Sequence, residues 1–166
     1  MTPHVTLKLR GFGELNSASE AWLAKRVQRD VRALPPRVDL VRQGEGSGPL
    51  HVLIEGWAIR YKTLEDGRRQ ILSVLIPGDI FDINGHLAKS MDHSIATLTQ
   101  TRVGLLDDDF LDIARARHSD LEKLLWCDMH VSSAIQRERS TSLGQRTARE
   151  RMAHFLCELF LRQRSV

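Results

Sequence analysis

The sequence is poor in cysteine and contains no long hydrophobic segment. Its two cysteines, Cys127 and Cys157, are far apart in stretches of helical character, so a disulfide framework is not expected and a cytoplasmic location is favoured. No run of eighteen apolar residues occurs, which argues against a membrane-spanning helix. Residues 1–15 have neither a continuous apolar core nor a small-residue cleavage site, so a secretory signal is not expected either.

The remaining composition is that of a globular chain with an uneven charge. Hydrophobic residues make up 42% and charged residues 27% of the 166 residues. Residues 136–166 carry seven Arg and three Glu, a net charge of +4, which leaves −1 on the other 135 residues (17 Lys and Arg against 18 Asp and Glu). This basic end indicates either proximity to nucleic acid or a solvated helix face.

Residues 37–107 have the pattern of short antiparallel strands. Segments 49–64 and 68–79 are rich in Val, Ile, Leu and aromatic residues, and the Glu-Asp-Gly sequence at 65–67 between them predicts a hairpin turn. Glycines at 44, 56, 67 and 78 recur at steps of 12, 11 and 11 residues, which predicts positive φ or sharp bends there. The expected fold class is mainly β with helices (α+β), built on an antiparallel double-stranded β-helix, a jelly-roll-like β-roll.

Helices are expected before and after this β region. Residues 17–32 begin with Ser-Ala-Ser-Glu at 17–20, a capping-box pattern. A second such pattern, at 119–122, opens a helical run to about Leu143, which Gly144 is expected to stop. A third, at 147–150, opens a final amphipathic helix with a single apolar stripe, and we expect either that this stripe folds back onto the β domain or that the sequence is the front part of a longer protein. The stripe consists of Met152, Phe155, Leu156, Leu159 and Phe160.

This order of elements resembles the sensor half of the Crp/Fnr superfamily of bacterial transcription regulators. The matching segments are LPPRVDLVRQGE (34–45), LHVLIEGWAIRYKTLEDGRRQILSVLIPGDIFD (50–82), MDHSIATLT (91–99) and LGQRTARERMAHFLCELFLR (143–162). The resemblance implies an N-terminal helix and a cyclic-nucleotide-binding-like β-roll at 1–117 and a long dimerisation helix at 118–144. It implies that 145–166 is the first helix of a DNA-binding domain whose winged helix-turn-helix is absent from this chain.

The resemblance also predicts where an effector binds. In the cyclic-nucleotide-binding members, a loop of the form G-E-L, about eight residues, then R-S/T-A supplies a Glu for the ribose and an Arg for the cyclic phosphate. An ungapped alignment places Ile83 at that Glu and His93 at that Arg. Ile83 cannot hydrogen-bond a ribose and His93 lacks the guanidinium fork, so we expect a degenerate pocket that does not bind cyclic nucleotides. The pocket residues are Asp82, Ile83, Asn84, Gly85, His93 and Ser94.

Other effectors stay open at this stage. His86, Asp92 and His93 are candidates for a small-molecule or metal site, although we favour the interpretation in which Asp92 and Ser94 cap the loop and His93 hydrogen-bonds the backbone. Residues 1–126 contain no Cys, which excludes the N-terminal iron–sulfur cluster of the family's oxygen-sensing branch. No cofactor is predicted, and haem is left open because seven His are present and no spacing singles one out.

The long helix is the segment through which the family dimerises. A 25-residue helix is about 37 Å long, more than a small β-roll covers, so we favour a homodimer seam over packing on the chain's own β-roll alone. One partly apolar seam of a and d positions consists of Leu121, Leu125, Asp128, Ser132, Ile135 and Arg139.

These patterns predict a regulatory sensor and dimerisation module of a Crp/Fnr-type regulator, and not an enzyme. The expected partners are a second copy of the chain, DNA through the absent winged helix-turn-helix and, by resemblance, RNA polymerase; no membrane partner is expected. One alternative is a stand-alone protein that dimerises with full-length regulators and blocks them. Another is a cupin-type metal enzyme, which is disfavoured because no H-x-H pair occurs and His86 and His93 are seven residues apart.

Overall fold

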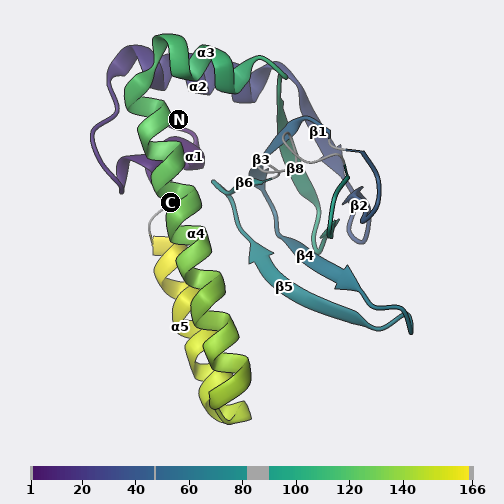
Figure 1. Cartoon of the computed structure of the whole chain (residues 1–166). Coiled ribbons are helices and arrows are strands. Elements are labelled where there is room, and N and C mark those ends of the chain that lie inside the picture. The colour runs from purple at the N-terminus through teal and green to yellow at the C-terminus, as the bar shows by residue number, and fades with distance from the viewer. Residues whose placement is uncertain (1, 47, 82–89, 165–166) are drawn as a thin grey trace.

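The chain folds into a β-roll covered by helices at one end and flanked by a long helical arm (Figure 1). The computed structural model describes residues 2–46, 48–81 and 90–164. The helices are α1 (His4–Arg10), α2 (Ser17–Arg29), α3 (Phe110–Arg117), α4 (Ser119–Gln145) and α5 (Ala148–Arg164). The strands are β1 (Val31–Leu34), β2 (Asp39–Val41), β3 (Leu50–Glu55), β4 (Ala58–Thr63), β5 (Arg69–Leu75), β6 (Ile80–Phe81), β7 (Ser94–Thr97) and β8 (Thr101–Leu106).

The strands form two four-stranded antiparallel sheets, with the orders β1-β8-β3-β6 and β2-β7-β4-β5. The chain passes repeatedly between the two sheets, with β4 and β5 paired as neighbours within one of them, so it winds as a roll, and the α+β prediction with an antiparallel β-roll is confirmed. A core cluster of side chains from both sheets fills the inside of the roll. Its members are Leu53, Ala58, Leu75, Phe81, Ile95, Val103 and Leu105.

The predicted glycine turns are confirmed. All four glycines have positive φ: 88° at Gly44, 85° at Gly56, 81° at Gly67 and 92° at Gly78. At Gly56 the backbone also comes so close to its neighbour that an added Cβ would lie 2.3 Å from the carbonyl oxygen of Gln100. Glycine is therefore required there for two independent reasons, conformation and space.

The helices share a second core with the β1-β8-β3-β6 sheet. Apolar side chains of α1, α2, α3 and α4 meet those of β3 and β8 in one buried cluster. Its most buried members include Val5, Leu9, Leu23, Val27, Val52, Leu106, Phe110 and Leu121. This cluster fixes the first half of α4 against the roll, while the second half of α4 continues past it with α5 returning alongside (Figure 1). No helix in the described part of the chain has the length and apolar character needed to cross a membrane.

The N-terminal region differs from the sequence-based expectation. The helix expected over 17–32 ends at Arg29, and Val31 begins β1, which pairs with β8. The N-cap of α2 is Asn16, whose side chain accepts from the N–H of Ser19 over 2.8 Å, so the predicted cap at Ser17 is wrong by one residue. The short helix α1 was not predicted; its buried face consists of Val5, Thr6 and Leu9.

Two other caps can also be compared. The capping box predicted at 119–122 does not form, because His118 occupies the N-cap of α4 without a side-chain bond and Glu122 accepts instead from Arg115 over 3.1 Å. The box predicted at 147–150 is present: Thr147 N–H donates to Glu150 over 2.8 Å and Glu150 N–H donates back to Thr147 Oγ1 over 3.4 Å. Helix α4 ends at Gln145, one residue beyond the predicted stop at Gly144.

Candidate effector cavity

A cavity of about 670 Å³ lies where the β-roll meets α4 and α5. This size falls within the range of small-molecule sites, roughly 300–1,000 Å³. The sheet strands β4 and β5 and the segment before β7 form one wall, α4 forms the facing wall, and the ends of α1 and α5 contribute side chains. The apolar part of the lining includes Phe12, Val74, Phe81, Met91, Val131, Ile135 and Leu161.

At one end of the cavity, Arg60, His93 and Asp92 form a hydrogen-bonded chain. Arg60 Nε donates to His93 Nε2 over 3.1 Å, and His93 Nδ1 lies 2.7 Å from Asp92 Oδ1. Because a guanidinium can only donate, Nε2 must accept, and the proton of the neutral ring is on Nδ1, where it is donated to Asp92. This hydrogen bond lowers the pKa of Asp92. His93 therefore binds two side chains, Arg60 and Asp92.

Ser94 does not line the cavity. It is buried at the start of β7, and its hydroxyl accepts from the backbone N–H of Gln43 over 2.9 Å. The side chain thus joins β7 to the segment after β2, which corrects its assignment to the pocket. The other predicted pocket residues, Asp82, Ile83, Asn84 and Gly85, lie outside the described residues, as does His86.

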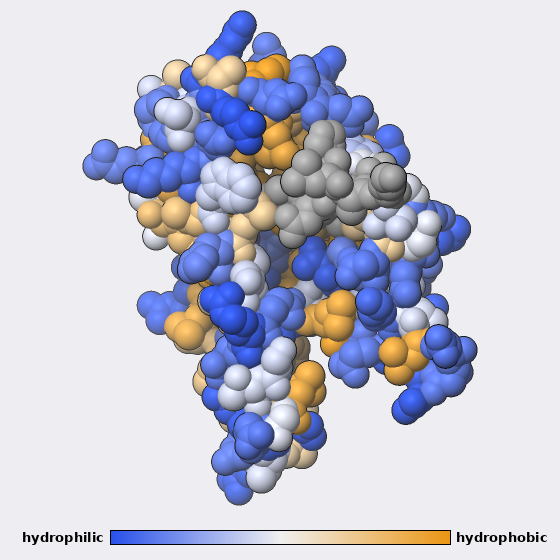
Figure 2. All heavy atoms as spheres, viewed as in Figure 1, coloured by the Kyte–Doolittle hydropathy of each residue, from blue (hydrophilic) through white to orange (hydrophobic). Residues whose placement is uncertain are grey.

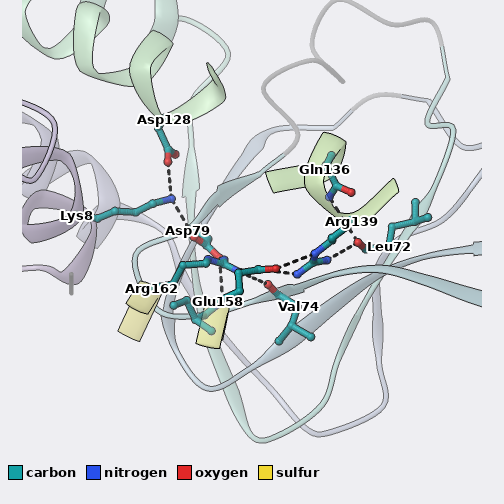
Figure 3. A network of polar contacts seen from close by, with 10 residues as sticks. Lys8, Leu72, Val74, Asp79, Asp128, Gln136, Arg139, Glu158 and Arg162 are labelled. Carbon is teal, nitrogen blue, oxygen red and sulfur yellow. Dashed lines mark hydrogen bonds and ion pairs between the residues drawn. The ribbon is translucent and has the colours of Figure 1, made fainter. Parts of the chain in front are cut away.

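The opposite end of the cavity holds a network of buried charges (Figure 3). Lys8 Nζ of α1 lies 2.9 Å from Asp79 Oδ1 and 2.7 Å from Asp128 Oδ1 of α4. Arg162 of α5 donates to Asp79 Oδ2 over 2.5 Å, and the N–H of Ile76 donates to the same oxygen over 2.9 Å. Asp79, in the turn before β6, therefore links α1 and α5 to the roll.

The electrostatics of this network follow from burial and pairing. The side chains of Asp79 and Asp128 are only 6% and 5% exposed. Burial lowers the pKa of Lys8, but the two carboxylates outweigh this effect and raise it above its ordinary value. Burial raises the pKa of Asp128, against the attraction of Lys8. A charged Lys8 is thus required to keep two buried carboxylates compensated.

The network continues along the outer edge of β5, the last strand of its sheet. Arg139 of α4 holds Glu158 of α5 with two hydrogen bonds, of 2.7 and 3.0 Å, and also donates to the carbonyl oxygen of Leu72. Arg162 donates to the carbonyl oxygen of Val74 over 3.0 Å. Arginines thus satisfy alternate carbonyls of an edge strand, which would otherwise be open to pairing with another chain.

Sequence reasoning missed the cations of this site. Three of them lie outside the predicted pocket segment, residues 82–94: Arg60, Lys8 and Arg162. The pairing of β4 with β7 places Arg60 opposite Ile95, next to the predicted pocket, so a correct strand register is the signal that could have found it. The basic charge of the C-terminal end includes Arg162, but a charge count does not identify the carboxylates that Arg162 binds.

The predicted dimer seam on α4 faces the chain itself over its first half. Leu121 and Leu125 are buried in the helix–sheet core, and Asp128 is bound to Lys8. These three residues are therefore not available to a second copy of the chain. In its first half, α4 packs on its own β-roll, which is the alternative to a dimer seam. Of the remaining seam residues, Ile135 and Arg139 are half-buried and Ser132 is exposed.

The apolar stripe of α5 is largely exposed within the described chain, so of the two alternatives for this stripe it does not fold back onto the β domain. Met152, Leu156 and Phe160 are 60%, 56% and 59% exposed, and Phe155 and Leu159 are half-buried. The helix is held through Glu158 and Arg162 on its polar side, because these side chains find partners in the network. Hydrophobic patches consequently interrupt the polar surface of the arm formed by α4 and α5 (Figure 2).

No group of three or more His, Cys, Asp or Glu side chains within the described ranges is placed to hold a metal ion. The Ser19 hydroxyl lies 2.9 Å from His118 Nδ1 and donates to Asp120 over 2.7 Å. Since the hydroxyl donates to the carboxylate and not to the imidazole, this cluster ties α2 to α4 and is not arranged to activate a nucleophile.

Comparison with known proteins agrees with this architecture. The family model described as "Cyclic nucleotide-binding domain" matches residues 31–117. The transcriptional activatory protein AadR of Rhodopseudomonas palustris (strain ATCC BAA-98 / CGA009) is 31% identical over 145 residues, which are 87% of this chain and 59% of AadR. The structure of FixK2 from Bradyrhizobium japonicum is 26% identical, with a TM-score of 0.69 over 78% of this chain and 64% of FixK2.

A third comparison concerns the fold alone. The catabolite activator protein of Thermus thermophilus, 22% identical, has a TM-score of 0.61 over 82% of this chain and 60% of its own. The β-roll with its adjoining helix is thus a sensor domain of the Crp/Fnr type. The chain belongs to the cyclic nucleotide-binding domain family and is homologous to Crp/Fnr-type regulators. It spans about three fifths of the length of the relatives that it matches.

Proposed function

We propose that this chain is the regulatory sensor and dimerisation module of a bacterial Crp/Fnr-type transcription regulator whose cavity does not bind cyclic nucleotides. The observation that carries the proposal is the hydrogen bonding of His93. This residue occupies the position at which the family resemblance expects the phosphate-binding Arg. Its two ring nitrogens already bind Arg60 and Asp92. A neutral imidazole held in this way offers a cyclic phosphate no fork of donors.

The other cations support the same conclusion. In the described part of the cavity lining, Lys8, Arg60, Arg139 and Arg162 each have a hydrogen-bond partner within the chain. A cyclic phosphate would have to displace one of these partners and leave it buried without compensation, which opposes binding. Asp92, beside His93, adds a negative charge that repels an anion.

Dimerisation is proposed to use the second half of α4. The helix has 27 residues and is about 40 Å long, so it extends beyond the part that the β-roll covers. In this half, the seam residue Ser132 is exposed, and so is Leu143, which lies outside the predicted seam and is 60% exposed. A symmetric pair of α4 helices would cover them, as closed homodimers do. The position of α5 would then transmit the state of the cavity to the DNA-binding part of the regulator.

Isothermal titration calorimetry with cyclic AMP and cyclic GMP tests the cavity. We expect no saturable binding below about 1 mM, that is, binding weaker than about −4 kcal/mol. His93→Arg restores the fork that the family uses and is a matched variant for the same titration; it should bind more tightly than the unaltered chain. A micromolar dissociation constant for the unaltered chain would refute this part of the proposal.

A further inference from the structure

The cavity contains a buried hydroxyl without a partner. Ser73, on β5, is 7% exposed and lines the cavity, and its Oγ makes no hydrogen bond to any group in the described part of the chain. It lies opposite Arg60 in the β4–β5 ladder, so the two side chains are on the same face of the sheet. Because a buried hydroxyl is unfavourable when it is unpaired, Ser73 is suited to a ligand that supplies the missing hydrogen bond.

The charges around Ser73 disfavour an ionic ligand. Asp79 is held by Lys8 and Arg162, and Arg139 is held by Glu158. An ion of either sign would have to break one of these pairs, whereas an uncharged molecule leaves all of them intact. The network therefore favours an uncharged ligand over an ionic one.

The walls favour an apolar body. Phe81 and Met91 approach from the roll, Val131 and Ile135 from α4, and Leu161 from α5. Methionine adapts its shape to different ligands, and aliphatic side chains offer no competing hydrogen bonds. With a volume of about 670 Å³, the space accepts a molecule of one or two fused rings with room to spare.

We propose that the cavity binds an uncharged, mainly apolar organic molecule that carries one hydrogen-bonding group, a hydroxyl or an amide, paired with Ser73 Oγ. This inference rests on the proposed function, since it names the ligand class of the same sensor cavity. Ser73 is then a specificity-determining residue, because it distinguishes a polar-headed molecule from a plain hydrocarbon of equal shape.

Calorimetry with rigid matched probes tests the ligand class. The probes are cyclohexanol, cyclohexanecarboxamide and cyclohexanecarboxylate, and the corresponding alcohol, amide and carboxylate of adamantane. We expect saturable binding of the alcohol or amide in at least one ring series and weaker binding of the carboxylate of that series. Ser73→Ala should weaken the alcohol or amide about fivefold, the effect of one hydrogen bond, without changing the carboxylate.

Ser73→Ala removes a hydroxyl that has no partner among the described residues, so this variant should remain folded, which thermal unfolding verifies. Ser140→Ala, an exposed serine of α4, is the matched control and should bind as the unaltered chain does. Three outcomes would overturn the proposal: no binding of any probe, tighter binding of the carboxylates, or equal binding of the alcohol to the unaltered chain and to Ser73→Ala. A cyclic AMP titration in the same buffer keeps the proposed function separate, because nucleotide binding would refute that function whatever the ring compounds do.

Discussion

Arg162 and Asp79 are joined by a hydrogen bond of 2.5 Å between Nη2 and Oδ2, across 83 residues of sequence. This contact connects the end of α5 to the turn between β5 and β6, at the wall of the effector cavity. The apolar stripe of α5 stays largely exposed, so the position of the helix depends on Arg162 and Glu158 instead. Because Asp79 is only 6% exposed, loss of Arg162 would leave a buried carboxylate with less compensation, so this contact contributes to holding α5 against the roll.

Replacing Arg162 by Gln should release α5 from the roll. The side chain is 19% exposed and bonds both Asp79 and the carbonyl of Val74, so its loss should lower the free energy of unfolding by about 2 kcal/mol. Amide hydrogen exchange should become faster in α5 while the β-roll keeps its protection. Arg164→Gln, two residues on and exposed, is the matched control. Unchanged exchange in Arg162→Gln would show that the exposed helix is held by something other than this network.

Gly56→Ala and Gly67→Ala should separate conformational strain from steric overlap. Both glycines have φ above 80°, which costs an alanine about 1–2 kcal/mol. At Gly67 an added Cβ meets nothing within 4 Å, whereas at Gly56 it lies 2.3 Å from the Gln100 carbonyl. We therefore expect urea unfolding to show a loss of about 1 kcal/mol for Gly67→Ala and about 3 kcal/mol or more for Gly56→Ala. Similar losses in the two variants would contradict the close approach at Gly56.

The hydrogen bonds of Asp120 should make stability depend on pH at the acidic end. Burial raises the pKa of Asp120, but the hydrogen bonds from the Ser19 hydroxyl and the Asn16 N–H outweigh it and leave the pKa below its ordinary value. A carboxylate whose folded pKa is lowered contributes stability above its unfolded pKa, near 3.9, and loses that contribution as the pH falls through the folded pKa. Urea unfolding of the unaltered chain and of Asp120→Asn should therefore differ most at neutral pH and converge toward pH 3.

Ser19→Ala removes one of the donors to Asp120 and serves as the partial variant in this series. Its difference from the unaltered chain should follow the same pH profile with a smaller amplitude. A difference between the unaltered chain and Asp120→Asn that stays constant from pH 7 to pH 3 would contradict the role assigned to the carboxylate charge.

Most of the fold could be predicted from local sequence patterns. The strands and the four glycine turns follow from alternation and backbone conformation within a dozen residues, and Thr147 with Glu150 shows that a short-range cap can be recognised in the same way. The capping box at 17–20 is wrong because Asn16 takes the N-cap position, and the backbone N–H of Asn16 is in turn bound by Asp120, 104 residues away. No pattern within one helix can reveal such a partner.

The candidate site was less accessible to sequence reasoning for the same physical reason. The family resemblance predicts an effector loop, but no local pattern predicts the ionic network, which joins Lys8 to Asp79 and Asp79 to Arg162 over 71 and 83 residues. The apolar positions of α4 identified a buried face correctly, yet periodicity does not say whether that face meets the chain's own core or a second copy. Leu121 and Leu125 meet the chain's own core.

This distinction yields opposite expectations for two leucines of α4. Leu125 is 3% exposed within the chain, so Leu125→Asp buries a charge and should unfold the protein. Leu143 is 60% exposed in the half of α4 proposed to pair with a second copy, so Leu143→Asp should leave the fold intact and shift the chain from dimer to monomer. Sedimentation velocity at tens of micromolar, with thermal unfolding of the same samples, measures both effects. Leu98→Asp, an exposed leucine of the β-roll, should change neither. A Leu143→Asp variant that remains a dimer would place the contact between copies elsewhere than the second half of α4, and a monomeric unaltered chain at this concentration would refute the proposed dimer.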